Sequence, residues 1–150
     1  EESAYPYTAG QGTSGQCTQP SSPEVYVSDP QQVEPDINAL IAAAANQPIS
    51  VAIDASSHDF QLYAGGVFRN ASCSRDLDHG VLVVGYQLSS NETQQAGDGS
   101  YIKIKNSWGT SWGEKGYIRF ELDLDNKEGT CGVAMQASYP KGLKNSTNTN

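Results

Sequence analysis

The 150-residue sequence has few positive charges. Nine Lys and Arg residues stand against seventeen Asp and Glu, which gives a formal net charge of −8 at pH 7. No run of basic residues interrupts this composition. Nucleic acids and anionic membranes bind proteins largely through such runs, so neither is an expected partner. Long hydrophobic runs are also missing, and none approaches the ~20 residues of a membrane span.

Aliphatic residues are scarce as well. Hydrophobic residues make up 37% of the chain, and residues 1–22 contain almost none of the aliphatic ones. A stretch that cannot form a core needs another surface to lie on. The sequence begins at Glu1, with no Met and no targeting segment. We interpret these absences as the signature of a processed or partial chain.

Cysteine is rare, and its count is odd. The three cysteines are Cys17, Cys73 and Cys131. In an oxidising compartment this number allows one bridge and leaves one thiol that is either reactive or paired outside the chain. Three N-x-S/T sequons provide candidate glycosylation sites at Asn70, Asn91 and Asn145. Together these features favour a secretory route or a lysosomal compartment.

The pattern along the chain predicts an α+β fold. Residues 1–23 are rich in Gly, Ser, Pro and Gln and are predicted to be irregular, and residues 24–140 to form the folded domain. One helix is predicted over Asp36–Asn46, with Asp36 as its cap. Strands are predicted at residues 24–28, 49–54, 81–86, 101–106, 117–122 and 137–140. They indicate an antiparallel sheet or half-barrel, followed by a disordered polar tail at 141–150.

Two polar residues stand at the ends of neighbouring predicted strands. His79 opens the apolar run 81–86, and Asn106 closes the alternating strand 101–106. An amide oxygen can hold one imidazole nitrogen and leave the other free to accept a proton. This pair is two-thirds of a Cys-His-Asn nucleophilic site. Trp108 would cover the His–Asn hydrogen bond and keep water from it.

Simpler interpretations exist for the same residues. A single histidine at a strand end is more often structural, and Trp108 would serve equally as a core aromatic. Asn106 is the residue that favours a catalytic interpretation of His79. His58 lies in the polar turn 56–59 and is predicted to be a surface residue. Three glycines are interpreted as backbone freedom for a tight turn: Gly109, Gly113 and Gly116.

Two segments resemble the histidine and asparagine signatures of papain-like cysteine peptidases, in particular the cathepsin L type. They are Asp78-His79-Gly80 through Tyr86, and Asn106-Ser-Trp108-Gly-Thr-Ser-Trp112-Gly-Glu-Lys-Gly-Tyr-Ile. Supporting similarities are Tyr5-Pro6-Tyr7 before Cys17, Asn46-Gln47-Pro48, residues 59–67 and residues 131–140. The resemblance covers roughly residues 4–140.

The resemblance implies a cysteine-type endopeptidase and the sheet-containing right-hand domain of the papain-like fold. His79 would be the base and Asn106 the residue that orients it. The nucleophilic cysteine is expected on the order of 50–70 residues before Glu1, so this C-terminal portion would be inactive alone. Neither a cofactor nor a metal is implied.

The resemblance also assigns further roles. Asp78 would influence substrate binding, and four residues would surround the pocket for the second residue before the cut: Leu77, Ala52, Gly80 and Gln136. Small Ala52 and Gly80 would leave room for a bulky apolar side chain. Cys73 would pair with Cys131, and Cys17 with a cysteine upstream of this chain.

Peptide or protein substrates, the missing N-terminal portion, and propeptide or cystatin-type inhibitors are the implied partners, in a lysosomal, vacuolar or secreted location. The alternative is a non-catalytic papain-like homologue that lacks the upstream cysteine and acts as a binding, storage or antigenic protein. The intact His79 and Asn106 favour the enzyme, because an inactive site does not require them. An independent β-type binding domain would leave the Asn-Ser-Trp block unexplained.

Overall fold

The computed structural model describes residue 3 and residues 5–8, 12–18, 25–69, 73–89 and 99–145. Its elements are β1 (Val25–Val33), α1 (Ile37–Ala44), β2 (Ile49–Ile53), α2 (His58–Gln61), β3 (Val67–Phe68), β4 (His79–Gln87), β5 (Tyr101–Lys105), β6 (Tyr117–Glu121), the 3₁₀ turn η1 (Thr130–Gly132) and β7 (Ala137–Asn145). Gln31–Tyr139 forms one compact unit, and the outer parts of β1 and β7 belong to another.

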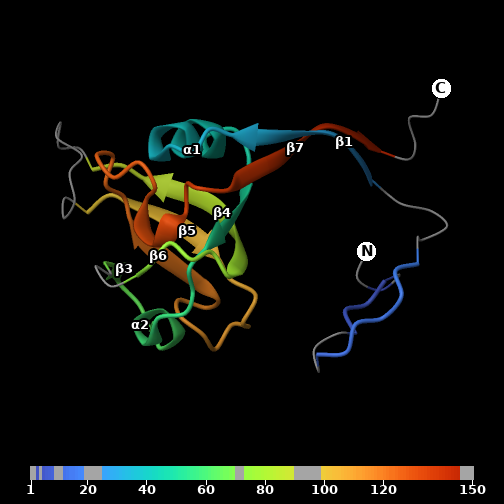
Figure 1. The fold of residues 1–150 in the computed structure, drawn as a ribbon, viewed down its shortest axis with the longest axis horizontal. Helices are drawn as coiled ribbons and strands as arrows, with labels where there is room; N and C mark the ends of the chain where they lie inside the picture. Colours follow the sequence, from blue (N-terminus) through green and yellow to red (C-terminus); the bar gives the residue numbers. More distant parts are fainter. Residues whose placement is uncertain are drawn as a thin grey trace. The chain divides into compact units, whose positions relative to one another are not determined.

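Seven strands form one mixed sheet in the order β1-β7-β2-β4-β5-β6-β3 (Figure 1). β2 pairs antiparallel with β7 and β4, and β5 pairs antiparallel with β4 and β6. The predicted α+β class and its antiparallel centre are therefore confirmed. β3 differs, because it pairs parallel with β6. A strand of two residues has no alternation that a sequence pattern can reveal.

Helix α1 begins where its cap predicts. The side chain of Asp36 accepts a hydrogen bond from the backbone N–H of Asn38 at 2.8 Å, which satisfies a donor of the first turn. Ile37 and Leu40 are buried, and the helix contacts β2 and β4. α1 ends at Ala44, two residues before the predicted end. None of the helices in the described part of the chain is long and apolar enough to cross a membrane.

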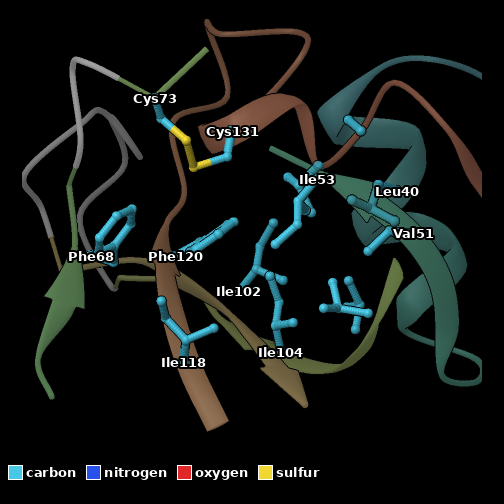
Figure 2. Packing of buried hydrophobic residues seen from close by; sticks show 14 of the residues in the cluster. Leu40, Val51, Ile53, Phe68, Cys73, Ile102, Ile104, Ile118, Phe120 and Cys131 are labelled. Atoms are coloured by element: carbon cyan, nitrogen blue, oxygen red, sulfur yellow. A yellow bond between two sulfur atoms is a disulfide. The ribbon is translucent and has the colours of Figure 1, made fainter. Parts of the chain in front are cut away.

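Alternate residues of the central strands build the core (Figure 2). Ile102 and Ile104 of β5 are buried, whereas Lys103 and Lys105 on the opposite face are exposed. Ile118 and Phe120 of β6 continue the buried face. This is the period of two predicted for residues 101–106.

A disulfide joins Cys73 to Cys131 at the edge of this core (Figure 2), with Cα atoms 5.1 Å apart. The pairing implied by the family resemblance is thus confirmed. Both cysteines are buried. The bond connects the segment that leads into β4 with the turn η1.

Strands β1 and β7, the first two in the order of the sheet, are longer than predicted. β1 runs over Val25–Val33 instead of 24–28, and β7 continues to Asn145, inside the segment predicted to be a disordered tail. β1 and β7 are neighbours in the sheet, so the backbone of each strand has hydrogen-bonding partners in the other. The polar composition of 141–145 does not reveal this pairing. Residues 146–150 lie outside the described residues. The described residues among 1–23 contain no helix or strand.

Candidate active site

His79 and Asn106 lie together at one end of the central strands β4 and β5. β4 begins with His79, and Asn106 follows the last residue of β5, its antiparallel neighbour. His79 Nε2 is 2.8 Å from Asn106 Oδ1. Because an amide oxygen can only accept, we infer that Nε2 carries the proton. Nδ1 of the neutral ring is then the nitrogen that can take one.

The amide of Asn106 is fixed in place. Its Oδ1 also accepts a hydrogen bond from the backbone N–H of Ser107 at 2.7 Å, and its own backbone N–H donates to the carbonyl of Gly116 at 2.9 Å. The residue is only 7% exposed. Two donors thus converge on one oxygen, while the buried Nδ2 has no hydrogen-bond partner among the described residues.

Aromatic rings cover the pair. The ring centroid of Trp108 is 5.2 Å from that of His79, with an angle of 32° between the planes. Phe60 contacts both, at 5.4 Å from Trp108 and 6.4 Å from His79. Trp108 is still 41% exposed, so it is a lid over the imidazole and not a core residue. This arrangement fits the cover predicted for Trp108, and its effect on catalysis stays a prediction.

Short α2 supports this cover. The hydroxyl of Ser57 accepts a hydrogen bond from the backbone N–H of Phe60 at 3.2 Å, which caps the helix. The indole N–H of Trp112 donates to the carbonyl of Gln61 at 3.0 Å. His58, the first residue of α2, is exposed, as predicted. The sequence pattern gave only a polar turn here, because a helix of four residues has no periodicity to recognise.

Gly113 shows why the turn after Asn106 requires glycine. Its φ is +56°, and a Cβ atom there would lie 2.6 Å from the carbonyl oxygen of Tyr117 and 2.9 Å from the ring of Tyr63. Any larger residue would displace this packing. Gly109 and Gly116 also have positive φ, which agrees with the interpretation of these glycines as turn residues.

Two acidic residues flank the strand pair Ile53–His79: Asp54 follows Ile53 in the chain, and Asp78 precedes His79. The carboxylate of Asp78 accepts a hydrogen bond from the backbone N–H of Ala55 at 2.8 Å. Asp54 is buried, and its carboxylate accepts from both the hydroxyl and the backbone N–H of Ser56, at 2.6 and 2.9 Å. These bonds, the hydroxyl first, hold the pKa of Asp54 below its ordinary value. Sequence reasoning missed Asp54, whose signal was a carboxylate between an apolar strand and two serines.

A hollow of about 560 Å³ is lined by Gly80, the residue that follows His79 in β4. Three of the four predicted pocket residues line it: Ala52, Gly80 and Gln136. Leu77 is not among its walls and instead lies against Gly132, where an added Cβ would be 2.8 Å from its Cδ2. Sequence reasoning missed Gln32, Ser50 and Ser138, which become neighbours only through strand pairing and carried no motif of their own.

The remaining predicted positions are less defined. Cys17 is exposed and has no disulfide partner in the described part of the chain. Asn70 and Asn91 lie outside the described residues, and Asn145 ends β7. No group of His, Cys, Asp and Glu among the described residues is arranged to hold a metal ion.

Comparison with known proteins identifies the family. Residues 1–141 match the papain family cysteine proteases. Vignain from Ricinus communis is 49% identical over 148 residues, which are 98% of this chain and 38% of that protein. The KDEL-tailed cysteine endopeptidase CEP2 from Arabidopsis thaliana is 46% identical over 99% of this chain and 39% of its own length.

Solved structures give the same result. Bromelain from Ananas comosus, in complex with the E64 inhibitor, superimposes with a TM-score of 0.77 at 37% identity, over 93% of this chain and 61% of bromelain. This chain belongs to the papain family of cysteine proteases. It spans less than two-fifths of the length of the vignain and CEP2 relatives.

Proposed function

We propose that this chain supplies the His–Asn half of a papain-like cysteine endopeptidase whose nucleophilic cysteine lies on protein outside this sequence. The observation that carries the proposal is the 2.8 Å contact between His79 Nε2 and Asn106 Oδ1. With Nε2 committed to Asn106, Nδ1 is the atom that would take the proton of a thiol placed beside it.

The proposed reaction divides hydrolysis into two steps. The thiolate attacks the peptide carbonyl, and the protonated imidazole of His79 gives its proton to the leaving amine as the C–N bond breaks. A water molecule then attacks the thioester, and His79 accepts the water proton and returns it to the departing sulfur. Asn106 keeps the ring oriented through both steps.

A matched pair of histidine substitutions tests the role of His79. In the intact protein, His79→Ala should lower kcat/KM for a peptide substrate by on the order of 10²–10⁴-fold or more, because the proton acceptor is lost. His58→Ala provides the control, since that exposed histidine of α2 lies outside the site. Comparable turnover by His79→Ala and the wild type would refute the proposed function.

The hollow lined by Gly80 supports peptide or protein substrates with a bulky apolar side chain two residues before the cut. Ala52 and Gly80 occupy little space in its walls, and Gln136 adds a hydrogen-bonding group. Hydrolysis of a peptide library varied at that position tests the preference. Ala52→Phe should then select for smaller side chains, and an unchanged preference in this variant would exclude the hollow as the selecting pocket.

We infer a lysosomal, vacuolar or secreted location for the protein, because the Cys73–Cys131 bond requires an oxidising route of synthesis. Cys17 would pair with a cysteine outside the chain, and Asp78 would contact substrate near the scissile bond. Propeptide and cystatin-type inhibitors are the expected regulators, since they would act by covering the same cleft.

A further inference from the structure

Four hydrogen-bonded residues join the turn between β5 and β6 to the segment that follows α2. The carboxylate of Glu114 accepts two hydrogen bonds from the guanidinium of Arg119, at 2.9 Å to Oε2 and 2.6 Å to Oε1. Its Oε1 also accepts a hydrogen bond from the backbone N–H of Gly66 at 3.0 Å. The hydroxyl of Tyr63 donates to the carbonyl of Gly66 at 2.6 Å. We call these four residues the Glu114 clamp.

The Glu114 clamp is better defined than an ordinary surface ion pair. The side chains of Glu114 and Arg119 are only 29% and 31% exposed, so water screens their interaction less. An arginine that holds both oxygens of a carboxylate also fixes its orientation. The hydrogen bond from Arg119, the largest cause, holds the pKa of Glu114 below its ordinary value. The clamp therefore sets the spacing between the two segments that it joins.

Those two segments carry the aromatic rings around His79. Helix α2 provides Phe60, and the turn between β5 and β6 provides Trp108 and Trp112. The ring centroid of Trp108 is 5.4 Å from that of Phe60 and 5.4 Å from that of Trp112. It is 5.2 Å from that of His79. Trp108 thus rests on one ring from each segment, and its place over the imidazole depends on how far apart the segments are.

We propose that Glu114 is a positioning residue of the site, which holds α2 and the β5–β6 turn together through the Glu114 clamp and so keeps Trp108 over His79. The inference rests on the proposed function, because the covered hydrogen bond matters for turnover only if His79 transfers protons. When the clamp is broken, the segments can separate and water can reach the bond between His79 Nε2 and Asn106 Oδ1. Competition from water weakens such a bond.

A matched pair of glutamate substitutions tests this role in the intact protein. Glu114→Ala should lower kcat/KM for a peptide substrate on the order of 10-fold, because a small displacement of a site is costly. Glu121→Ala is the control: it breaks the ion pair with Arg69 at the opposite end of β6 and should change kcat/KM by less than about twofold. Titration with an epoxide inhibitor counts the intact sites, so that unfolded protein does not enter kcat. Equal rates for the two variants overturn the proposal.

A double substitution tests whether the effect passes through Trp108. Where Trp108 is already replaced by alanine, Glu114→Ala should cost little further activity, because the two changes remove the same cover. An equal loss in both backgrounds indicates a different route through the turn and overturns the proposal. If Glu114→Ala does not fold, Glu114→Gln takes its place in both comparisons. Its amide oxygen still accepts from Gly66, whereas its amide nitrogen cannot accept from Arg119, so a loss of about threefold is expected.

Proton exchange at His79 provides a readout that requires no turnover. At a temperature where both variants are folded, the Nε2 proton of His79 should exchange with water about 10-fold faster in Glu114→Ala than in Glu121→Ala, as measured by NMR of histidine-labelled protein. Equal exchange rates in the two variants overturn the proposal.

This measurement separates the two proposals. Faster exchange in Glu114→Ala, in a protein that hydrolyses no peptide, would refute the proposed function and leave the effect of the Glu114 clamp on His79 in place. Peptide hydrolysis by a protein in which Glu114→Ala alters neither the exchange nor kcat/KM would do the reverse.

Discussion

Asn106 contributes to the site through geometry, not charge. Its carbonyl oxygen holds His79 Nε2 and is itself held by the N–H of Ser107, so the imidazole is fixed against rotation. A carboxylate at this position would stabilise the imidazolium more strongly, whereas a neutral amide only fixes the orientation of the ring. This geometry suits the proposed function, in which His79 must both take and return a proton.

Removal of this amide should slow the reaction. In the intact protein, Asn106→Ala should lower kcat/KM on the order of 10²-fold, because the ring loses its orientation. Asn106→Asp should recover part of the rate, because a carboxylate oxygen can also accept a hydrogen bond from Nε2. Activity of Asn106→Ala within twofold of the wild type would show that orientation by this residue is unimportant.

Asp54 links stability to pH. Its folded-state pKa is below the ordinary 3.8, so its contribution is present above that pH and is lost as the pH falls through the lower folded-state value. At pH 7, Asp54→Asn should reduce the free energy of unfolding by about 1–3 kcal/mol, because the buried bonds to Ser56 weaken. The difference from the wild type should decrease below pH 3.8.

Urea unfolding of the intact protein at several pH values between about 3 and 7 measures this effect. Asp125→Asn is a suitable control, since Asp125 is exposed. A difference between Asp54→Asn and the wild type that stays constant over the whole range would show that the Asp54 carboxylate does not titrate as argued.

At the scale of residues, the sequence predicts the catalytic pair but not its surroundings. His79 begins one strand and Asn106 follows the end of the next strand along the chain. When two such strands pair antiparallel, the start of the first lies next to the end of the second. Asp54 also ends a predicted strand, but its burial could not be predicted, because it depends on contacts with Ser56 and with the backbone of Cys131, 77 residues further along the chain. Ser50 and Gln32 were missed for the same reason, since they meet only across strands.

At the scale of elements, sequence reasoning succeeds where a pattern is long enough to be read. The alternation of β5 and the cap of α1 are both visible in the sequence and both form as predicted. β3 and α2 have two and four residues, too few for a period. The length of β7 depends on its partner β1, which is a tertiary effect that local composition does not contain.

The turn between β5 and β6 should tolerate little change. Gly113→Ala should reduce the free energy of unfolding by roughly 2 kcal/mol or more, since the new Cβ meets the carbonyl of Tyr117 and the ring of Tyr63. The near-ultraviolet circular dichroism of Trp112 should change with it. Gly85→Ala in β4 is the control, because an added Cβ there has no neighbour within 4 Å. Equal stability of the two variants would contradict the packing described.

At the scale of the whole molecule, the proposed function gives this chain only half of a site. Trp108 and Leu62 are large apolar side chains that are 41% and 78% exposed. The 150 residues alone should neither hydrolyse peptides nor react with epoxide inhibitors at an active site, and they should self-associate and bind hydrophobic dyes. Fluorogenic peptide assays and size-exclusion chromatography measure this. Hydrolysis by the isolated chain, or a monomer that binds no dye, would show that less is missing than we infer.

Cys17 provides a test of how the protein is connected. If Cys17 pairs with a cysteine outside this chain, it should be unreactive in a free-thiol titration of the intact protein that is denatured without a reductant. It should become reactive after reduction. Where the two parts are separate chains, reduction should also release a partner in intact-mass analysis. A Cys17 that alkylates fully without reduction would refute the predicted bridge.

The bridge between Cys73 and Cys131 has a consequence for how such an enzyme meets its chemical surroundings. In the proposed enzyme a sulfur nucleophile would work only while it is kept reduced, whereas the Cys73–Cys131 bond must stay oxidised. Cys73 and Cys131 are 8% and 4% exposed, so small thiols in solution have little access to them. Cys73 precedes His79 by six residues and Cys131 precedes Gln136 by five. Under the proposed function, rupture of this one bond would therefore loosen both the proposed proton acceptor and the hollow proposed to select substrate, and turnover and selectivity would be lost as a unit.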